Sequence, residues 1–324
     1  MHLAVTVEDA RAMLGLNARA FAKILEELGE TTHETPSGKR TLTTVEPSTM
    51  RAVRGVRGEN LGLFNGKKIV AFQGCKGGIG KTTLAYNVAV RAAQYGNRVL
   101  CIDTDQQAHL TMCLLGKEAG KHCWLDIFEE RVPLAETIVP VGEHLDLVPS
   151  NLRMAIAEKR LGNTIHPKRI VAQYLTAIRD NYDIVLFDCA PALSSINHAV
   201  AFASDIVIIP QTTSRLSLDG LELSLDFLRE LREDFGMAPE VRIVCNMFSQ
   251  QETPSLRTLY SLMEQHQGAL FQTAVRRCVK YPEAVDYERP LFLLGYRPSI
   301  AVEDLDALTR ELLGLGGLRH GKNR

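Results

Sequence analysis

The sequence predicts an α/β fold with a mostly parallel, doubly wound sheet, preceded by a small helical domain. Three observations lead to this prediction. From about residue 67 onward, continuous runs of Val, Ile and Leu alternate with helical patterns, as in sheets that are covered on both faces. A glycine-rich loop separates the first of these runs from the first long helix. Residues 1–54 have a shorter helical periodicity of their own.

The alternating runs define the elements expected in the large domain. We expect strands at 68–73, 98–102, 145–149, 183–187, 205–210, 241–245 and 270–275. We expect helices at 82–95, 167–180, 217–234, 255–267 and 299–313. The last of these helices has one apolar face, which favours packing against the domain and consists of Leu305, Leu308, Leu312 and Leu313.

The N-terminal region begins with two predicted short helices. Thr6, with Asp9 three residues later, resembles a capping box, and Gly15 ends the first helix. Asn17 can cap a second helix. The apolar face of this second helix consists of Phe21, Ile24, Leu25 and Leu28. Two short helices joined by a glycine-containing turn suggest a helix-turn-helix.

A hairpin and a third helix are expected to follow. The turn Pro36-Ser37-Gly38-Lys39-Arg40 lies between Thr-rich, β-prone residues, and a short helix is marked by Met50 and Val53. Glycines recur at 55, 58, 62 and 66, which predicts a linker. We therefore divide the chain into a head at 1–54, a linker at 55–66 and a large domain at 67–324.

The head resembles the winged helix-turn-helix of MerR-type regulators and of some plasmid partition ATPases. This resemblance implies DNA contacts from the second helix and the wing, made by Arg19, Lys23, Lys39 and Arg40 and continued by Arg51, Arg54 and Arg57. From Pro36 to Lys68 there are seven Lys or Arg residues against two Glu. The alternative is a dimerisation module with a solvated basic face, and the two roles can coexist.

Whole-chain properties narrow the classes of function. The 324 residues carry a net charge of −1, so contact with nucleic acid has to use a local patch. The seven cysteines are scattered without a C-x-x-C pair, which predicts free thiols rather than disulfides or a metal centre. No apolar run approaches the roughly 18 residues of a membrane-spanning helix. We expect a soluble, cytoplasmic protein.

The stretch Gly74-Cys75-Lys76-Gly77-Gly78-Ile79-Gly80-Lys81-Thr82-Thr83 indicates a phosphate-binding loop. It lies between a predicted strand and a predicted helix, which is the context that a P-loop requires. The glycines let backbone N–H groups approach phosphate oxygens, and the helix adds its N-terminal dipole. Lys81 is expected to reach the β- and γ-phosphates and Thr82 to bind Mg²⁺. The ordinary Walker A motif has Gly at the position of Cys75, and here a second lysine, Lys76, follows it.

Three aspartates follow predicted strands and are expected near this loop. Asp103 and Asp105 come after the second strand and Asp188 ends the fourth, and strand carboxyl ends line the ligand crevice of a doubly wound sheet. One of the first two can activate water while the other supports the metal shell. Asp103 capping its own loop is the alternative. Asp188 behind a P-loop is typical of a Walker B carboxylate that holds Mg²⁺.

Together these motifs resemble those of the ParA/MinD family of deviant-Walker ATPases, in particular its partition branch, over about 67–313. Lys76 fits the family's additional lysine. The stretch 103–111 resembles D-x-D-P-Q-G-N-x-T, and 188–191 resembles D-x-P-P. Residues 205–221 resemble a strand followed by A-L-E-G-L, and 275–290 resemble I-P-R-N-V-R-L-S-E-A…K-P.

The resemblance implies an ATP- and Mg²⁺-dependent homodimer in which Lys76 crosses to the partner's phosphates. Gly77, Gly78, Ile79 and Gly80 belong to the nucleotide loop, Lys81 and Thr83 bind phosphate, Asp105 positions water, and Thr82, Asp103 and Asp188 serve the metal. It further implies non-specific DNA binding through Arg277 and Lys280, for which a solvated loop is the alternative. Asn246 contacts adenine or is structural. A ParB-type adaptor would stimulate hydrolysis and release a nucleoid-associated carrier from DNA.

The sequence departs from the family pattern at three places. Gln106 and Ala190 replace prolines, and His109 replaces an asparagine. Loss of proline relaxes the loops expected to sense the γ-phosphate, so we expect slow hydrolysis without a partner. Two other functions remain open. One is a MinD-like membrane-cycling ATPase, which the weakly apolar tail 316–324 disfavours, since stable membrane association needs an amphipathic helix. The other is a transcriptional regulator that uses ATP only as a ligand.

Overall fold

The computed structural model describes residues 1–37, 40–63, 66–116, 122–129, 132–162, 167–236, 239–287, 289–294 and 299–315. Lys39 and the tail 316–324 lie outside the described residues, as does the side chain of Arg40. The predictions made for them are therefore not addressed by the structure.

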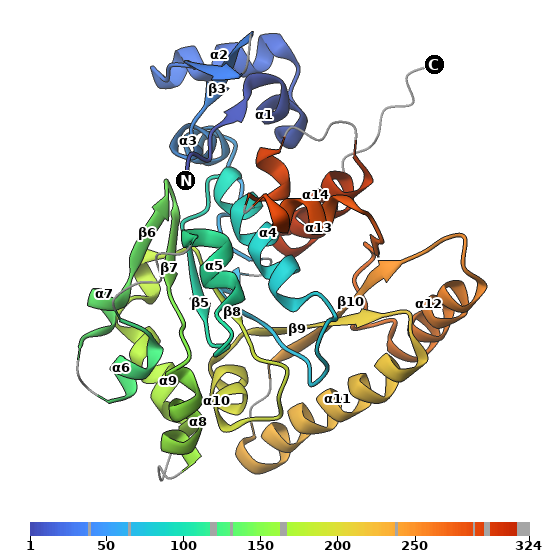
Figure 1. Ribbon diagram of the computed structural model, residues 1–324. Coiled ribbons are helices and arrows are strands. Elements are labelled where there is room, and N and C mark those ends of the chain that lie inside the picture. The colour runs from blue at the N-terminus through green and yellow to red at the C-terminus, as the bar shows by residue number, and fades with distance from the viewer. Residues whose placement is uncertain are drawn as a thin grey trace.

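An eight-stranded sheet forms the centre of the molecule, with the order β11-β10-β9-β4-β8-β5-β7-β6 (Figure 1). The strands are β4 (Ile69–Phe72), β5 (Val99–Asp103), β6 (Val139–Gly142), β7 (Leu145–Val148), β8 (Ile184–Asp188), β9 (Ile206–Thr212), β10 (Glu240–Phe248) and β11 (Val275–Arg276). All neighbouring pairs are parallel except β6 with β7. The mostly parallel sheet is confirmed. The edge strand β6 was not predicted, and β11 is much shorter than expected.

Helices cover both faces of this sheet. The expected helices are present as α4 (Lys81–Gln94), α9 (Pro167–Thr176), α11 (Arg215–Phe235), α12 (Thr253–His266) and α14 (Ile300–Leu313). Six further helices are shorter: α5 (His109–Leu115), α6 (Trp124–Phe128), α7 (Leu134–Thr137), α8 (Met154–Gly162), α10 (Ser195–Ala203) and α13 (Lys280–Asp286). None of these six exceeds nine residues, so an apolar period of 3.6 repeats too few times to be recognised.

Alternate residues of each strand enter two separate cores. In β4, Val70 and Phe72 join α4, α5 and α14 on one face, whereas Ile69 and Ala71 join α6, α8, α10 and α11 on the other. This division follows from the two-residue period of strand side chains. The predicted apolar face of α14 is buried in the first core, because Leu305, Leu308, Leu312 and Leu313 are all at most 2% exposed.

The N-terminal region forms a small separate sheet with three helices, above the main body in Figure 1. Its elements are β1 (Val5–Thr6), α1 (Val7–Leu14), α2 (Ala18–Leu28), β2 (His33–Ser37), β3 (Arg40–Val45) and α3 (Pro47–Val56). Thr6 and Asn17 cap α1 and α2 through their side chains, and Gly15 adopts φ 63° after α1, all as predicted. The predicted hairpin is the antiparallel pair β2–β3.

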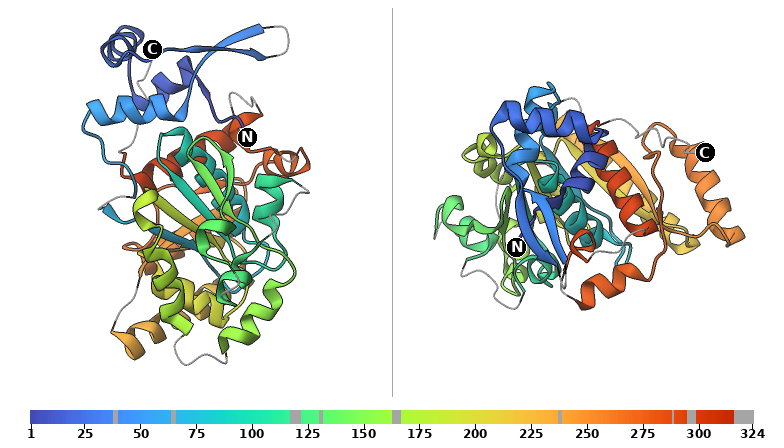
Figure 2. Two further views of the ribbon diagram at one scale, coloured as in Figure 1. Left: turned by 90° about the vertical axis from the view of Figure 1, so that its left-hand side faces the viewer. Right: turned by 90° about the horizontal axis from the view of Figure 1, so that it is seen from above.

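The head packs tightly on the body (Figure 2). One core cluster runs from Phe21 and Met50 of the head to Val90 of α4 and Leu308 of α14. Arg54 has no exposed surface and donates a hydrogen bond of 2.8 Å to the Tyr95 carbonyl. The prediction that Arg54 extends a DNA-facing basic surface is therefore wrong, because its guanidinium is used to join the two regions.

Two neighbouring arginines make internal contacts as well. Arg51 pairs with Asp183 and donates to the Gly96 carbonyl at 3.1 Å, and Arg57 donates to the Leu14 carbonyl at 2.7 Å. The connecting segment is packed too, since Leu63 is fully buried. Arg51 and Arg54 of this positive stretch thus dock the head on the body, whereas the contact of Arg57 lies within the head. Among the described residues, no helix combines the length and apolar character needed to cross a membrane.

Candidate nucleotide-binding site

The glycine-rich loop connects β4 to α4, as predicted, and its path requires glycine at one position above all. Gly80 adopts φ 89° immediately before α4 begins at Lys81. A Cβ atom at Gly80 would lie 2.3 Å from the Asn246 amide nitrogen. Any other residue at this position would therefore displace either the loop or Asn246.

The loop forms one wall of a cavity of about 730 Å³. Asp105, Gln106 and His109 form a second wall, and the segment 190–192 after β8 forms a third. On the far side, the cavity is closed by side chains of α4, α5 and α13, namely Tyr86, Asn87, Met112, Cys113, Tyr281 and Ala284. The predicted loop and Asp105 are thus brought together at one cavity, with Gly77, Gly78, Lys81, Thr82 and Thr83 in its lining.

Lys81 lies at the bottom of this cavity with 6% of its surface exposed. Its ammonium donates a hydrogen bond of 2.9 Å to the Lys76 carbonyl, which belongs to the same loop. Burial lowers the pKa of Lys81, and the carboxylates of Asp188 and Asp105 counteract part of this effect. A phosphate group bound in the cavity would place negative charge next to this ammonium and so stabilise the charged form of Lys81.

Asp103 and Asp188 face each other across adjacent strands, since they are register partners in β5 and β8. Both are almost completely buried. Burial raises the pKa of Asp188, and the nearby Asp103 raises it further, whereas the Thr82 hydroxyl and Lys81 lower it. Burial likewise raises the pKa of Asp103, against the hydrogen bonds from Thr111. Two buried carboxylates side by side are unfavourable unless a cation or a proton joins them.

The hydrogen bonds of the two carboxylates differ sharply. Asp103 accepts from the Thr111 hydroxyl at 2.7 Å, the Thr111 amide at 2.9 Å and the Asp105 amide at 3.1 Å. Neither carboxylate oxygen of Asp188 has a hydrogen-bond partner among the described residues. The structure therefore favours the loop-capping alternative for Asp103, whereas the buried carboxylate of Asp188 is compensated only in part, by the nearby Lys81 ammonium and Thr82 hydroxyl.

This arrangement fits a magnesium ion that is shared with phosphates. The hydroxyl of Thr82, which lines the cavity, and the oxygens of Asp188 directly behind it are hard oxygen donors. Within the described part of the chain, no group of three His, Cys, Asp or Glu residues could hold a metal alone. Mg²⁺ commonly binds through one or two protein ligands plus substrate phosphates and water, which is what these residues offer.

Asp105 is held in place by its own loop and by residues that sequence reasoning missed. Its carboxylate accepts from the Gln107 amide at 2.9 Å, and its carbonyl accepts from the Ser150 hydroxyl at 2.6 Å. The Ser150 amide in turn donates to the Thr111 hydroxyl at 2.9 Å. Thr111 stands in the motif that was compared with the family pattern, but nothing in the sequence indicates Ser150, which is brought here by the β5–β7 pairing.

Lys76 occupies the front of the loop, half-buried, beside Gly220 of α11. Its neighbour Cys75 is anchored to that helix, because the Cys75 amide donates to the Ser224 hydroxyl at 3.2 Å. Within the described residues the Lys76 ammonium has no hydrogen-bond or salt-bridge partner.

Asn246 supports the loop and does not line the cavity. Its side-chain nitrogen donates to the Ile79 carbonyl at 2.8 Å, and its side-chain oxygen accepts from the Met247 amide at 2.9 Å. Since both polar ends of the amide are engaged in the protein, the structure favours the structural role over the adenine contact.

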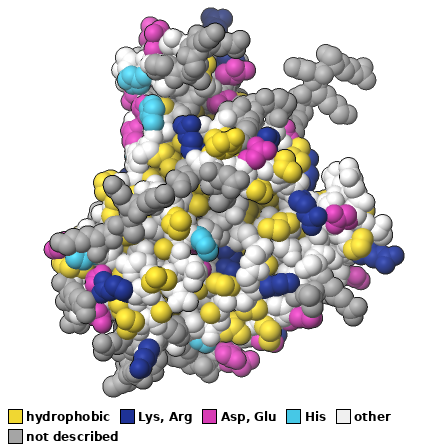
Figure 3. Space-filling model, in the orientation of Figure 1, with side chains coloured by type: hydrophobic (Ala, Val, Ile, Leu, Met, Phe, Trp, Pro, Cys, Tyr) yellow, Lys and Arg dark blue, Asp and Glu magenta, His cyan; other side chains and the backbone are white. Residues whose placement is uncertain are grey.

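Of the residues predicted to contact DNA, Arg19, Lys23 and Arg277 are exposed and Lys280 is half-buried, and three of the four have a carboxylate nearby. Lys23 lies 3.5 Å from Glu27, Arg277 lies 3.1 Å from Glu252, and Lys280 lies 2.6 Å from Glu283. Arg19 is exposed on α2. Figure 3 shows Lys and Arg side chains scattered over this face of the molecule rather than gathered in one patch. The structure does not bring these residues together.

The fold and the site define a P-loop nucleoside triphosphatase, and comparison with known proteins specifies the class further. A family model described as an AAA domain matches residues 67–243. The chain is 31% identical to the cell division protein PomZ of Myxococcus xanthus over 75% of its length and 76% of the relative's. It is 28% identical to the sporulation initiation inhibitor protein Soj of Bacillus subtilis, over 77% of this chain and 99% of Soj.

Among solved structures, an ATP complex of a variant of McdA from Cyanothece superimposes with a TM-score of 0.70. It covers 78% of this chain and 98% of McdA at 21% identity, which establishes likeness of fold. The chain thus belongs to this AAA domain family and, with these relatives, to the ParA/MinD family of ATPases. The family expected from the motifs is confirmed.

Proposed function

We propose that the protein is a magnesium-dependent ATPase of the partition type, which works as a nucleotide-controlled dimer. The observation that carries this proposal is the buried Asp188, whose carboxylate oxygens lie behind Thr82 and Lys81, two residues that line the P-loop cavity. A buried carboxylate that is only partly compensated costs stability, so its retention is best explained by a cation that arrives with the nucleotide. The ATP complex of McdA supports the choice of nucleotide.

In this proposal the residues of the cavity divide the work. Lys81 and Thr83, with the amides of Gly77 to Gly80, bind the phosphates, and Thr82 and Asp188 hold Mg²⁺, with Asp103 supporting them through its loop. The metal supplies charge stabilisation to the phosphate oxygens. Asp105 orients the attacking water, which the fixed backbone of its loop permits.

Lys76 completes the site of a second copy of the chain. Its ammonium lacks a partner in the described part of its own chain, and Lys76 directly precedes Gly77 and Gly78, which line the cavity. A cation donated in this way stabilises transition-state charge and is worth roughly 10³–10⁵ in rate where arginine fills the role. Hydrolysis would then separate the dimer.

The relatives support a role in positioning cellular cargo. Soj and PomZ take part, by their names, in sporulation control and cell division. We propose that the ATP-bound dimer binds DNA, that Arg19, Lys23, Arg277 and Lys280 contribute to this contact, and that a ParB-type adaptor stimulates hydrolysis. These residues are scattered, and Lys23, Arg277 and Lys280 are paired with carboxylates. We therefore expect DNA binding to require a dimer, which brings twice as many basic residues to the DNA. A head that dimerises without touching DNA remains compatible with its docked arginines.

The Lys76→Ala variant tests the proposal. We expect it to bind ATP with appreciable affinity but to lose hydrolysis and ATP-dependent dimerisation, whereas Lys81→Ala should lose ATP binding itself. Dimerisation is measured by light scattering with ATP, with ADP and without nucleotide. Normal turnover by Lys76→Ala would refute the dimeric mechanism. Equal affinity for non-specific DNA in all three nucleotide states would refute the ATP-controlled DNA carrier. Repression of transcription by an Asp105→Ala variant at the normal level would instead favour the regulator.

A further inference from the structure

The loop at 189–194 forms one wall of the nucleotide cavity. Its first residue is anchored, because Cys189 is buried and its amide donates to the Phe72 carbonyl at 3.2 Å, but its tip at 190–193 has little packing of its own. The loop follows Asp188 and precedes α10, and its side chains at 190 and 192 are single methyl groups. Pro191, Ala192 and Leu193 are all exposed. Among the described residues, the backbone N–H of Ala190 donates no hydrogen bond. A loop with so few contacts needs another restraint if it is to keep one position beside the phosphates.

Asn197 supplies this restraint. It lies in the first turn of α10 with 2% of its surface exposed. Its side-chain nitrogen donates to the Ala190 carbonyl at 2.9 Å and to the Ala192 carbonyl at 2.6 Å. An amide nitrogen has two protons to donate, so one side chain can hold both ends of the loop's tip. The reverse orientation would place oxygen against two carbonyls, which fixes how the amide is turned.

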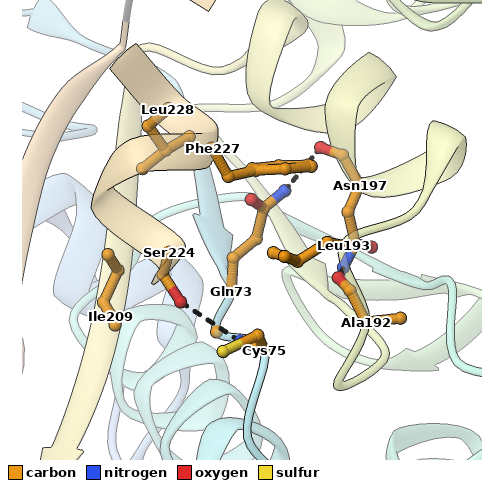
Figure 4. A pocket seen from close by; sticks show the side chains of 10 residues that line it. Gln73, Cys75, Ala192, Leu193, Asn197, Ile209, Ser224, Phe227 and Leu228 are labelled. Atoms are coloured by element: carbon orange, nitrogen blue, oxygen red, sulfur yellow. Dashed lines mark hydrogen bonds between the residues drawn. The ribbon is translucent and has the colours of Figure 1, made fainter. Parts of the chain in front are cut away.

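The same asparagine is tied to the base of the phosphate-binding loop. Gln73, the first residue after β4, is 4% exposed, and its side-chain nitrogen donates to the Asn197 carbonyl at 2.9 Å. Figure 4 shows Gln73, Asn197 and Ala192 beside Cys75 and Ser224, around a pocket of about 10 Å³. A pocket of this size holds at most one water molecule, so the cluster is a structural joint and not a ligand site.

We propose that Asn197 is the positioning residue of the loop at 189–194 and fixes it relative to the phosphate-binding loop through Gln73. The inference rests on the proposed ATPase function and adds a residue to it. Asn197 does not touch the nucleotide. It acts through the carbonyls of Ala190 and Ala192, so that the loop next to Asp188 is in place before a γ-phosphate arrives.

The Asn197→Ala variant should leave ATP binding largely intact while it slows turnover. We expect KM for ATP to stay within about three-fold of wild type and kcat to fall on the order of ten- to a hundred-fold, as misplaced catalytic loops do. Ser194→Ala is the matched control. The Ser194 hydroxyl caps the same helix, because it accepts a hydrogen bond of 3.1 Å from the backbone N–H of Asn197, but it does not contact the tip of the loop. An equal loss of kcat in both variants would mean that only helix stability matters, which overturns the proposal.

A second substitution tests whether the asparagine acts by restraining the loop. Proline at position 190 fixes one backbone dihedral and removes an N–H that has no acceptor among the described residues. We therefore expect Ala190→Pro to restore most of the kcat lost in Asn197→Ala and to do nothing for Ser194→Ala. Absence of rescue overturns the proposed mechanism of restraint.

Hydrogen–deuterium exchange of the nucleotide-free protein separates this inference from the ATPase proposal. The amides of 189–194 should exchange faster in Asn197→Ala than in wild type or Ser194→Ala, and Ala190→Pro should slow them again. This outcome is expected whether or not the protein hydrolyses ATP. Unchanged exchange in an Asn197→Ala protein that circular dichroism shows to be folded would overturn the positioning role. If Asn197→Ala does not fold, exchange is measured in Gln73→Met instead, and unchanged exchange in that variant would likewise overturn the proposal.

Discussion

The two ends of helix α4 treat their polar groups in opposite ways. At its C-terminal end, the Tyr95 hydroxyl lies 3.0 Å from Asp306, Arg91 lies 2.6 Å from the same carboxylate, and Arg310 donates to the Tyr95 hydroxyl at 3.1 Å. At its N-terminal end, Lys81 has only a carbonyl of its own loop, and both oxygens of Asp188 lack a partner among the described residues.

This difference shows which end of α4 depends on a bound ligand. At the C-terminal end of α4, residues of the head and of α14 supply hydrogen-bond and ion-pair partners for the polar groups. These contacts stabilise the folded protein without a ligand. The N-terminal end keeps buried charges that the protein neutralises only in part, which destabilises it until a ligand binds. Substitutions at the two ends should therefore change different quantities.

The largest effect is expected from Lys81→Ala. This change removes the buried ammonium that faces the phosphates, so we expect ATP affinity to become undetectable in the micromolar range and turnover to fall by at least about 10²–10³-fold. Stability without nucleotide should change little, because the ammonium is poorly compensated there. Isothermal titration with ATP and a phosphate-release assay measure these outcomes. Wild-type affinity in this variant would contradict the assignment of the cavity.

A large loss of stability is expected at the other end from Arg54→Met. This change removes the donor to the carbonyls of Tyr95 and Asn60 and leaves Glu59 with Arg57 in place of two arginine partners. We expect the free energy of unfolding to fall by about 3 kcal/mol, the size expected for a broken buried network. Urea denaturation measures it. Arg19→Met, at an exposed position of the same head, should change stability by less than about 0.5 kcal/mol.

The contrast between the ends also explains what could be read from the sequence. The sheet, the P-loop and the strand-ending aspartates were predictable, because each depends on a local pattern such as the run before Gly74 or the strand that ends at Asp188. The shared cavity then follows from the parallel sheet, which gathers strand carboxyl ends at one edge.

Residues whose partners are distant in the chain could not be predicted. Arg54 and Arg51 look like part of a basic surface, yet they contact Tyr95 and Asp183, 41 and 132 positions away. Asn246 reaches Ile79 across 167 positions, so its structural role appears only when β10 and the P-loop are adjacent. A sequence shows which side chains are charged but not which of them will be satisfied internally.

A moderate effect of opposite sign is expected from Asp188→Asn. Since the carboxylate of Asp188 is buried next to Asp103 without a hydrogen-bond partner among the described residues, its neutralisation should stabilise the nucleotide-free protein. We expect a gain of roughly 1–3 kcal/mol, the scale of one unsatisfied buried polar group. The stabilisation that we expect Mg²⁺ and ATP to give the wild type should be lost in this variant. Thermal unfolding with and without Mg²⁺–ATP tests both; a less stable apo variant would contradict the model of a charge that is only partly compensated.

The smallest effect is expected from the pH dependence of the head–body junction. Burial raises the pKa of Asp183, but hydrogen bonds from Arg51 and Arg98 outweigh this and lower it below its usual range. A carboxylate with a lowered pKa in the folded state stabilises the protein above the unfolded pKa of about 4, and this contribution disappears as the pH falls through the folded value. Wild type should therefore lose about 1 kcal/mol more than Asp183→Asn between pH 6 and about pH 3. Urea denaturation across this range measures the difference. Parallel stability curves for the two proteins would show that the docking arginines do not depend on the charge of Asp183, and would place the strength of the junction in its apolar core instead.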